Sequence, residues 1–366
     1  MKKEEMDIQL SVIETERKYS ALDYSETTYS NNAIVSYGKE NDMPILLRNC
    51  YRGSATLKSV IDQYIPYILG ENIIVSDNIA KFRTQVNESG MTMRQFIASL
   101  ALDYMVYGGF CFQVVLSKMG TIHSLIPLDF SRARTNETGT KIFYSNKGWT
   151  KWGTKSVEYP RFNPEERQPS SIFYFKGDFT KNVYPLPTWY GALYDVLTEI
   201  ECSKYSLNSV SCGFSARYVI NLPNAGNLTK EQKDIINQDI KKKFAGVESE
   251  SNFMLYFSNS DKAVTVNKVE SDDATDRYIA IKDNCRSNIY TALRCSPLLM
   301  GLPAQNGFST SEYRDCFKIF NKCVIQPIQD MIIECLDKTF VKALNGEHAV
   351  IIEPFEIKFE SENEEQ

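Results

Sequence analysis

The chain has 366 residues, of which 43% are hydrophobic and 12% aromatic, and its formal net charge at pH 7 is −5. This length corresponds to about two or three domains with a sizeable core. No apolar run approaches the roughly 20 residues of a membrane-spanning helix, and the charged segment Met1–Asp7 lacks the apolar core of a signal peptide, so a cytoplasmic protein is expected.

The first half of the chain predicts a mixture of helices and short strands. Residues 1–45 are polar and mixed in charge, and are expected to form a solvated or partner-binding arm. Apolar spacing predicts helices at Thr56–Leu69 and Met91–Tyr107, each ended by glycine. Strands are predicted at Phe110–Leu116, Thr121–Ile126, Lys141–Tyr144, Trp149–Trp152 and Ser171–Lys176, and the first two should form a hairpin.

The middle of the chain predicts two long helices that flank a small β-α-β-β unit. Thr188 is expected to cap the first helix, over 189–212, and the second covers 276–295. The apolar stripe of the second helix is Ile281, Cys285, Ile289 and Leu293. The unit between the helices has strands at Ala216–Leu222, Phe253–Phe257 and Ala263–Val269, and a helix that begins at the capping box Thr229–Gln232. Two helices that carry a small tip indicate a mechanical part.

The last third predicts a long helix after a polar loop. The helix opens with the capping box Ser309–Glu312, and Pro327 should kink it because proline lacks an N–H and crowds the preceding turn. Its apolar stripe is Tyr313, Phe317, Phe320, Val324, Ile328, Met331 and Cys335. Strands are predicted at Ala349–Ile352 and Phe355–Phe359, before an acidic tail.

No catalytic, cofactor-binding or metal-binding motif is found in the sequence. Phosphate-binding, zinc-protease and serine-hydrolase patterns are absent, and only two histidines are present. The nine cysteines form no C-x-x-C pair and are expected to be buried in a reducing compartment. Asp272–Asp273 should favour a helix start, and Asp103 should be partnered or exposed. The sequence therefore predicts a protein that is not an enzyme; the alternative is an α+β enzyme or binding protein with a carboxylate-based site.

The order of these segments resembles the portal proteins of tailed bacteriophages. From Arg277 to Leu336 the chain has the family's helix, proline-containing turn, polar loop and serine-rich helix start, followed by Ile-x-Pro-Ile at Ile325–Ile328. Phe96–Gly109, Ile122–Arg134 and Tyr190–Leu193 agree with the family in the same order. This colinear set covers about residues 50–345.

The resemblance implies an α+β, portal-like fold without a large crown. Its expected segments are an N-terminal arm (1–45), a wing (46–188), a first stem helix (189–215), a clip (216–275), a second stem helix (276–297), a tunnel loop (298–309), a long kinked wing helix (310–345), and C-terminal strands with an acidic tail (346–366). The missing crown is a departure from many portals.

The resemblance also implies a function and partners. The chain would form a ring, expected to be a dodecamer, at one capsid vertex through which double-stranded DNA is packaged and ejected. Expected partners are other copies of the chain, the major capsid protein and scaffold, the terminase large subunit, a neck or adaptor protein, and DNA without sequence specificity; neither a cofactor nor a membrane is implied. The location would be the virion, and the host cytoplasm during assembly.

Candidate contact residues follow from this layout. Channel-facing residues of the tunnel loop would be Gln305, Asn306, Phe308 and Ser309, unless this is an ordinary surface loop. Lys241, Lys242 and Lys243 on the clip would contact the motor or an adaptor, or form a solvated face. On the second stem helix, Arg277, Lys282, Arg286 and Arg294 would pair between subunits or touch DNA. Twelve copies at −5 each carry a formal charge of −60, so the ring should not hold DNA tightly.

Overall fold

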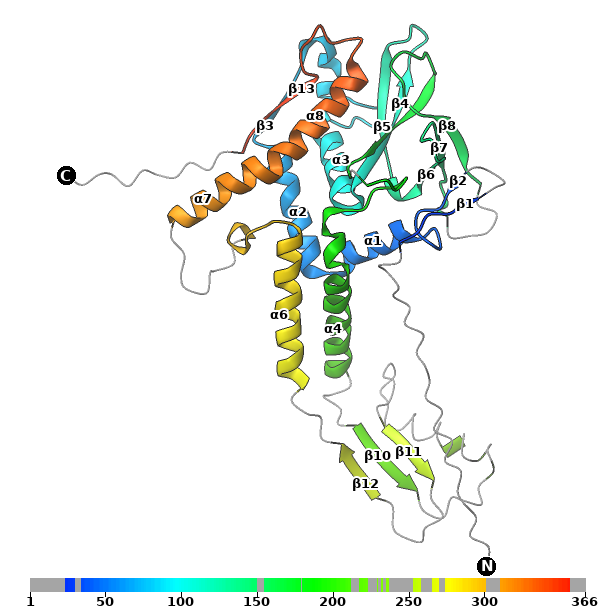
Figure 1. Ribbon diagram of the computed structural model, residues 1–366, viewed down its shortest axis with the longest axis vertical. Coiled ribbons are helices and arrows are strands. Elements are labelled where there is room, and N and C mark those ends of the chain that lie inside the picture. Colours follow the sequence, from blue (N-terminus) through cyan, green and yellow to red (C-terminus); the bar gives the residue numbers. More distant parts are fainter. Residues whose placement is uncertain are drawn as a thin grey trace, which may run out of the picture.

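The computed structural model describes residues 24–29, 34–149, 155–178, 180–211, 217–222, 229, 232, 235–236, 253–257, 265–269, 274–300 and 310–355. It is a mixed α+β structure, in which two helices project from a body of helices and small sheets toward a separate sheet (Figure 1). The helices are α1 (Met43–Gly53), α2 (Ala55–Leu69), α3 (Met93–Tyr107), α4 (Leu193–Ser211), α6 (Ala274–Ala292), α7 (Thr310–Phe320) and α8 (Gln326–Phe340). The predicted fold class is confirmed.

Short strands make up five small sheets. Their bounds are β1 (Thr28–Tyr29), β2 (Ile34–Val35), β3 (Asn72–Val75), β4 (Gly109–Leu116), β5 (Ile122–Leu128), β6 (Ala133–Thr135), β7 (Lys141–Tyr144), β8 (Val157–Pro160), β9 (Ser170–Lys176), β10 (Arg217–Leu222), β11 (Phe253–Phe257), β12 (Thr265–Val269) and β13 (Val350–Glu353). The sheet orders are β1-β2, β13-β3, β5-β4-β9, β6-β7-β8 and β11-β10-β12. In the last sheet, β10 is central, parallel to β11 and antiparallel to β12.

The helices of the body begin and end where the sequence signals them. The Ser54 hydroxyl accepts from the Leu57 N–H at the start of α2, and Thr92 forms a reciprocal capping box with Gln95 at the start of α3. α3 ends at Gly108, which has φ 81°, and a Cβ there would lie 2.6 Å from the Leu186 carbonyl oxygen. Both predicted helices and the β4–β5 hairpin are confirmed.

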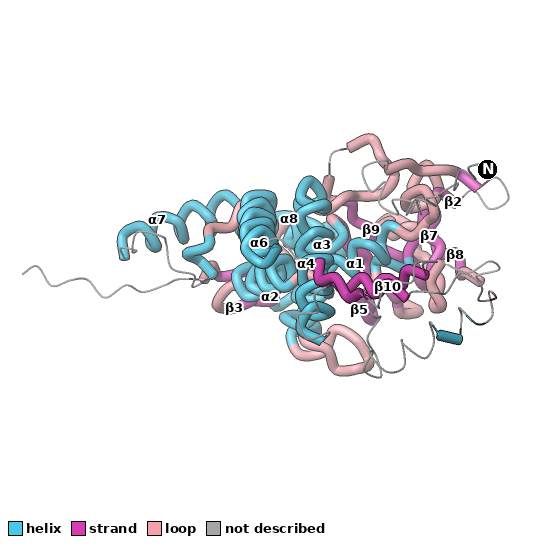
Figure 2. Tube along the Cα trace, turned by 90° about the horizontal axis from the view of Figure 1, so that it is seen from below, coloured by secondary structure: helices cyan, strands magenta, loops and turns pink. Residues whose placement is uncertain are grey.

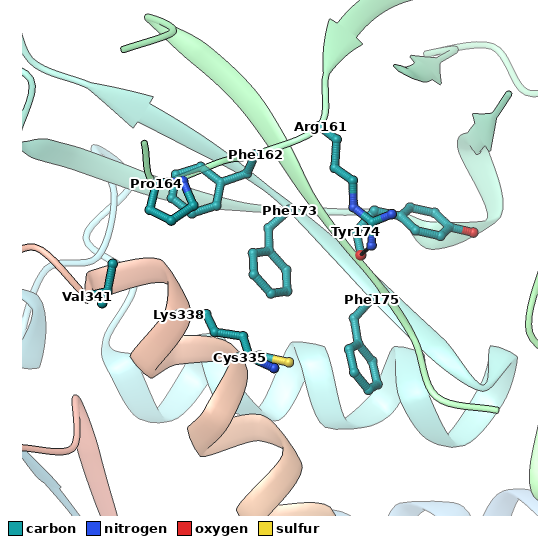
Figure 3. Close-up of a pocket in the computed structure, with 9 residues that line it drawn as sticks. All are labelled: Arg161, Phe162, Pro164, Phe173, Tyr174, Phe175, Cys335, Lys338 and Val341. Atoms are coloured by element: carbon teal, nitrogen blue, oxygen red, sulfur yellow. Dashed lines mark hydrogen bonds between the residues drawn. The ribbon is translucent and has the colours of Figure 1, made fainter. Parts of the chain in front are cut away.

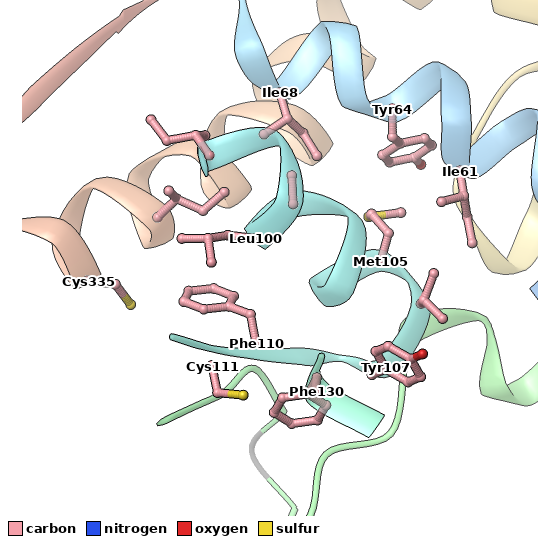
Figure 4. Packing of buried hydrophobic residues seen from close by; sticks show 14 of the residues in the cluster. Ile61, Tyr64, Ile68, Leu100, Met105, Tyr107, Phe110, Cys111, Phe130 and Cys335 are labelled. Carbon is pink, nitrogen blue, oxygen red and sulfur yellow. The ribbon is translucent and has the colours of Figure 1, made fainter. Parts of the chain in front are cut away.

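The core of the body lies where α3 packs between the β5-β4-β9 sheet and α2 (Figure 4). Leu100 and Met105 of α3 and Phe110 of β4 are at most 3% exposed. Phe112 lies against Phe96 with ring centroids 5.3 Å apart and stacks on Phe173 at 4.8 Å. Burial of this apolar surface stabilises the body from which the two long helices extend.

The segment before α1 belongs to this body rather than to a solvated arm. Ile34 and Val35 are at most 5% exposed, and Tyr37 is fully buried and stacks on Tyr184 at 4.4 Å. The Tyr37 hydroxyl donates to the Pro185 carbonyl. The expectation of a polar arm over 1–45 is therefore wrong for these residues, because a short apolar stretch lies inside a polar segment.

The first of the two projecting helices, α4, starts differently from its prediction. A 3₁₀ turn over Thr188–Ala192 precedes α4, with Pro187 at its N-cap position and no side-chain capping bond. The predicted Thr188 cap is wrong; burial of Trp189, whose indole N–H donates to the Met105 carbonyl at 2.9 Å, holds the turn instead. The Thr229–Gln232 capping box is confirmed, since each residue's backbone N–H donates to the other's side chain at 3.0 and 3.4 Å.

Pro327 is accommodated by a π-helical turn rather than by a simple kink. Asn321–Ile325 connects α7 to α8, and the Gln326 N–H donates to the Asn321 carbonyl five residues back. This extra residue moves the apolar stripe on by one position. Phe317, Phe320 and Cys335 are buried as predicted. From the turn onward, however, Ile325, Ile332 and Leu336 are buried, whereas the predicted Val324, Ile328 and Met331 are only half-buried.

Several other expectations have definite outcomes. Six of the nine cysteines are buried and free, as predicted: Cys50, Cys111, Cys202, Cys285, Cys295 and Cys335. Cys316 is half-buried, Cys323 is exposed, contrary to the prediction, and Cys212 lies outside the described residues. Thr150–Trp152, Asp272–Asp273, Ser309 and Glu356–Phe359 lie outside the described residues. Among the described residues, no helix is both long and apolar enough to cross a membrane.

Candidate functional site

The two projecting helices, α4 and α6, run antiparallel and contact each other along their length (Figure 1). Near the body, the Asn288 side-chain amide donates to the Asp195 carboxylate at 2.9 Å. Farther out, the rings of Tyr205 and Tyr278 stack with centroids 4.4 Å apart. These contacts hold the small β11-β10-β12 sheet beyond the far ends of both helices.

Burial along α6 decreases with distance from the body. Cys285, Ile289 and Leu293 are at most 4% exposed, as the predicted stripe requires. Ile281, the fourth member of that stripe, is 41% exposed, and its neighbour Ile279 is 54% exposed. The outer part of α6 therefore keeps apolar side chains that the described part of the chain does not cover.

The first projecting helix has the same character. Tyr194 and Tyr205 are 40% and 42% exposed, and Leu207 is 66% exposed. A groove runs along the pair of helices and is lined by Tyr194, Leu197, Thr198, Glu201, Cys202, Tyr205 and Tyr278. Exposed apolar patches of this kind on a protein surface mark contacts with another molecule.

The described basic residues of the predicted second stem helix have different surroundings. Arg286 is exposed and pairs with Asp283 of its own helix at 3.4 Å, whereas Lys282 is half-buried. Arg294 lies past the helix end with φ 54°, where it terminates α6. Arg277 lies within α6, but its side chain is outside the described residues.

The remaining predicted site residues lie outside the described part of the chain. These are Lys241, Lys242 and Lys243, and Gln305, Asn306, Phe308 and Ser309. The structure does give the two sides of the predicted tunnel loop. Its first residues belong to a 3₁₀ turn, Pro297–Met300, which is anchored by the buried Leu299, and α7 follows it.

Helix α2 connects the projecting helices to α8, a feature that the sequence analysis missed. At its start, the buried Glu199 carboxylate of α4 accepts from the Ser54 hydroxyl and, at 2.7 Å, from the Thr56 hydroxyl. In its middle, the Tyr64 hydroxyl donates to the Leu293 carbonyl. At the end of α2, the Gln329 side-chain amide of α8 donates to the backbone carbonyls of Ile68 and Tyr67 at 3.0 and 3.2 Å. No clear sequence signal marks this link, because Glu199 lies two residues from the exposed Glu201 and looks the same as it in sequence.

A second groove lies between α8 and the β9 strand (Figure 3). Its lining is Arg161, Phe162, Pro164, Phe173, Tyr174, Phe175, Cys335, Lys338 and Val341. This lining contains neither a carboxylate nor a histidine, so it offers no acid–base pair. In the described part of the chain, no cluster of three or more His, Cys, Asp or Glu side chains could hold a metal ion.

One carboxylate has a strongly shifted pKa, as a carboxylate-based site would need. Burial, and then the nearby charge of Asp129, raise the pKa of Asp103 well above its usual value. Its bonding partner is the Phe130 backbone N–H, at 3.4 Å. Asp103 lines neither groove described above, and Asp129 is already bonded to Ser131 and paired with Arg132. We interpret Asp103 as a buried acid of the core.

The raised pKa predicts a stability change with pH. Asp103 binds its proton more tightly in the folded chain, so its contribution to stability is present at acid pH and is lost as pH rises. Asp103→Asn is expected to raise the thermal unfolding temperature at pH 8, with a difference from the wild type that shrinks toward pH 4. Asp62→Asn, at an exposed position on α2, is the control and should show no such trend. An unchanged or lower unfolding temperature for Asp103→Asn at pH 8 contradicts the prediction.

Comparison with known proteins gives one family and a set of similar folds. The family model described as "Phage portal protein" matches residues 72–363. A chain from the neck of an empty gene transfer agent particle, computed with C6 symmetry, has a TM-score of 0.59 and 14% identity over 86% of this chain and 84% of that chain. The HK97-family phage portal protein from Corynebacterium diphtheriae has a TM-score of 0.51 and 12% identity over 84% and 93%. No curated protein sequence matches the chain.

Proposed function

The chain belongs to the phage portal protein family, whose members form the channel at one capsid vertex, and we propose that twelve copies form a closed ring around this channel. The observation that carries the proposal is the α4–α6 projection, with its small end sheet and its uncovered apolar side chains. In a ring, each copy would cover the exposed residues of the next. This arrangement makes the contact heterologous and closed.

The arrangement of helices and sheets supports an assignment of stem, clip and wing within each subunit. We propose that α4 and α6 are the stem, that the β11-β10-β12 sheet is the core of the clip, and that residues 46–188 and 310–345 form the wing. A similar chain comes from the neck of a particle computed with C12 symmetry, which supports a dodecamer. The family consists of structural proteins, and catalysis would come from a separate motor.

Partners and location follow from the same proposal. The clip would bind the terminase large subunit during packaging and a neck or adaptor protein afterwards, with Lys241, Lys242 and Lys243 as contacts. The wing would contact the major capsid protein and scaffold. The acidic ring would let double-stranded DNA pass without tight binding, because it lacks the net positive charge that counterion release requires. Assembly would take place in the host cytoplasm and the final location would be the virion.

The ring is tested by electron microscopy of the purified protein together with mass determination by light scattering. We expect particles with a central hole and a mass near twelve times 41.9 kDa. A chain that remains a monomer on concentration and with capsid protein present would contradict the proposal. Scaffold and capsid protein are included because some rings assemble only with partners.

The segment 298–309 is proposed to be the tunnel loop at the narrowest part of the channel. Its place between α6 and α7, at the body end of the stem, supports this assignment. Deletion of Ala304–Phe308 is expected to leave ring assembly intact and to reduce DNA packaging or retention by at least about tenfold, because steric contact with DNA is lost. The measurement is DNA per assembled particle. Normal packaging by deletion rings would contradict the assignment.

A further inference from the structure

Two exposed patches, one on α7 and one on the β13-β3 sheet, are both apolar at their centre and carry opposite charges. The first, the α7 patch, consists of Lys318, Ile319 and Lys322. Ile319 is 65% exposed, although it lies between two positions, Phe317 and Phe320, that are buried against α2. Neither lysine has an ion pair with any described residue of its own chain.

The second patch lies on the outer face of the two-stranded β13-β3 sheet. Ile74 and Ile351 are directly opposed in the register of this sheet and are 41% and 53% exposed. Their neighbours along the strands, Ile73 and Ile352, face the core and are at most 8% exposed. Cross-strand apolar pairs gain stability when they are covered, yet no described part of the chain covers this one.

Two glutamates lie at one end of this isoleucine pair. Glu353 follows Ile352 on β13, and Glu71 precedes β3 and donates its backbone N–H to the Glu353 carbonyl at 3.0 Å. Both side chains are exposed, and neither has an ion-pair partner among the described residues. The β3–β13 patch (Glu71, Ile74, Ile351 and Glu353) is therefore apolar with an acidic edge.

The positions of the two patches fit a ring contact. Figure 2 looks along α4 and α6, and in the half of the molecule that contains α7, β3 lies on the opposite side from α7. A closed ring with its axis along the stem has neighbours on these two sides. In a heterologous interface, each subunit uses two different patches, one toward each of its two neighbours. The two patches must therefore lie on different sides of the subunit.

We propose that the α7 patch of each subunit docks on the β3–β13 patch of its neighbour. Ile319 covers the Ile74–Ile351 pair, and Lys318 and Lys322 pair with Glu71 and Glu353. Asp315 is also exposed and lies one turn before Ile319 on the same face of α7, at the edge of the α7 patch. The inference rests on the proposed ring and adds the wing contact that accompanies stem packing.

A charge-swap experiment tests the ionic part of the contact. Lys318→Glu with Lys322→Glu, and separately Glu71→Lys with Glu353→Lys, should each lower the association constant between subunits about five- to thirtyfold, since two exposed ion pairs become repulsive. The fourfold variant restores opposite charges and should recover assembly to about the wild-type level. All four positions are exposed, so circular dichroism should show unchanged folding. Lack of recovery in the fourfold variant would contradict the pairing.

A cross-linking experiment tests the apolar part and separates it from the ring itself. In a Cys323→Ser background, which removes the one thiol that is exposed among the described cysteines, Ile319→Cys with Ile351→Cys should give a ladder of covalent multimers after oxidation of assembled rings. Ile319→Cys with Val157→Cys is the matched control, because Val157 is 55% exposed but lies on β8. If Ile319→Cys with Ile351→Cys assembles into rings but gives no more covalent multimers than the control pair, the contact between the α7 patch and the β3–β13 patch is wrong while the ring itself stands. Failure of the wild-type chain to form any ring would overturn the proposed function and the contact with it.

Discussion

Ile281→Asp is expected to leave each subunit folded and to abolish its ring, whereas Leu293→Asp is expected to prevent folding altogether. The two residues belong to one apolar stripe on α6, about three helical turns apart. Leu293 is 3% exposed, and its backbone carbonyl accepts from Tyr64 of α2. Loss of the leucine costs about 2–5 kcal/mol, and an unpaired carboxylate in the core costs several more. This sum is comparable to the whole stability of a typical protein.

Ile281 differs because its own chain leaves it 41% exposed. A carboxylate there remains solvated in the monomer, so we expect a change of less than about 0.5 kcal/mol in the free energy of unfolding. In the ring, the same carboxylate would be buried against a neighbour at every interface. Mass by light scattering and circular dichroism distinguish the outcomes. Ile281→Asp rings of normal mass would show that this face of α6 does not contact a neighbour.

Sequence patterns predicted the elements of this fold well where local signals determine them. α3 ends at the predicted glycine, and the strands of the β4–β5 hairpin lie within two residues of their expected bounds. The stripe on α6 was also correct from Cys285 to Leu293. These features depend on neighbours in the sequence, so the sequence alone carries the information.

The errors arise where tertiary contacts override the local pattern. The stripe on the last helix was predicted with constant spacing, but the π turn at Asn321–Ile325 shifts the buried face by one residue. Similarly, Thr188 has the residue type of a cap, yet burial of Trp189 sets the start of that turn. Helical periodicity cannot reveal an inserted residue whose only local sign is a nearby proline.

The candidate site was predictable only in outline. Exposed Ile279 and Ile281 looked the same in sequence as buried Ile289, because the distinction depends on where α6 leaves the body. The link from Glu199 to α2 joins residues more than 140 positions apart, and no local signal announces it. Pairing of α7 with the β3–β13 sheet likewise requires the three-dimensional positions of both patches.

Arg134→Met is expected to cost about 3–5 kcal/mol in the free energy of unfolding, because it leaves the buried carbonyl acceptors that hold the N-terminal segment without a donor. Arg134 is 1% exposed, and its guanidinium donates to the Asn41 side chain at 2.5 Å and to the Asn41 carbonyl at 3.0 Å. It also donates to the carbonyls of Ser131 and Ala133 at 2.9 and 2.8 Å. Burial lowers the pKa of this guanidinium.

The surroundings of Arg134 explain why lysine should not replace it. The guanidinium lies 5.6 Å from the ring of Tyr37, 6.0 Å from that of Tyr184 and 5.4 Å from that of Trp149, with carbonyl rather than carboxylate acceptors. A lysine ammonium cannot reproduce the planar fork that reaches four acceptors among stacked rings. Arg134→Lys should therefore cause more than about half of the loss in the free energy of unfolding that is expected for Arg134→Met.

Arg132→Lys is the matched control, two residues away and paired with Asp129 at the surface, where we expect a change below about 1 kcal/mol. Limited proteolysis supplies the decisive readout, because Asn41 lies between the buried Tyr37 and the start of α1. Cleavage within residues 24–42 should accelerate in both Arg134 variants before the rest of the body unfolds. Equal protection of this segment in the Arg134 and Arg132 variants would mean that Tyr37 and Tyr184 hold it without the guanidinium.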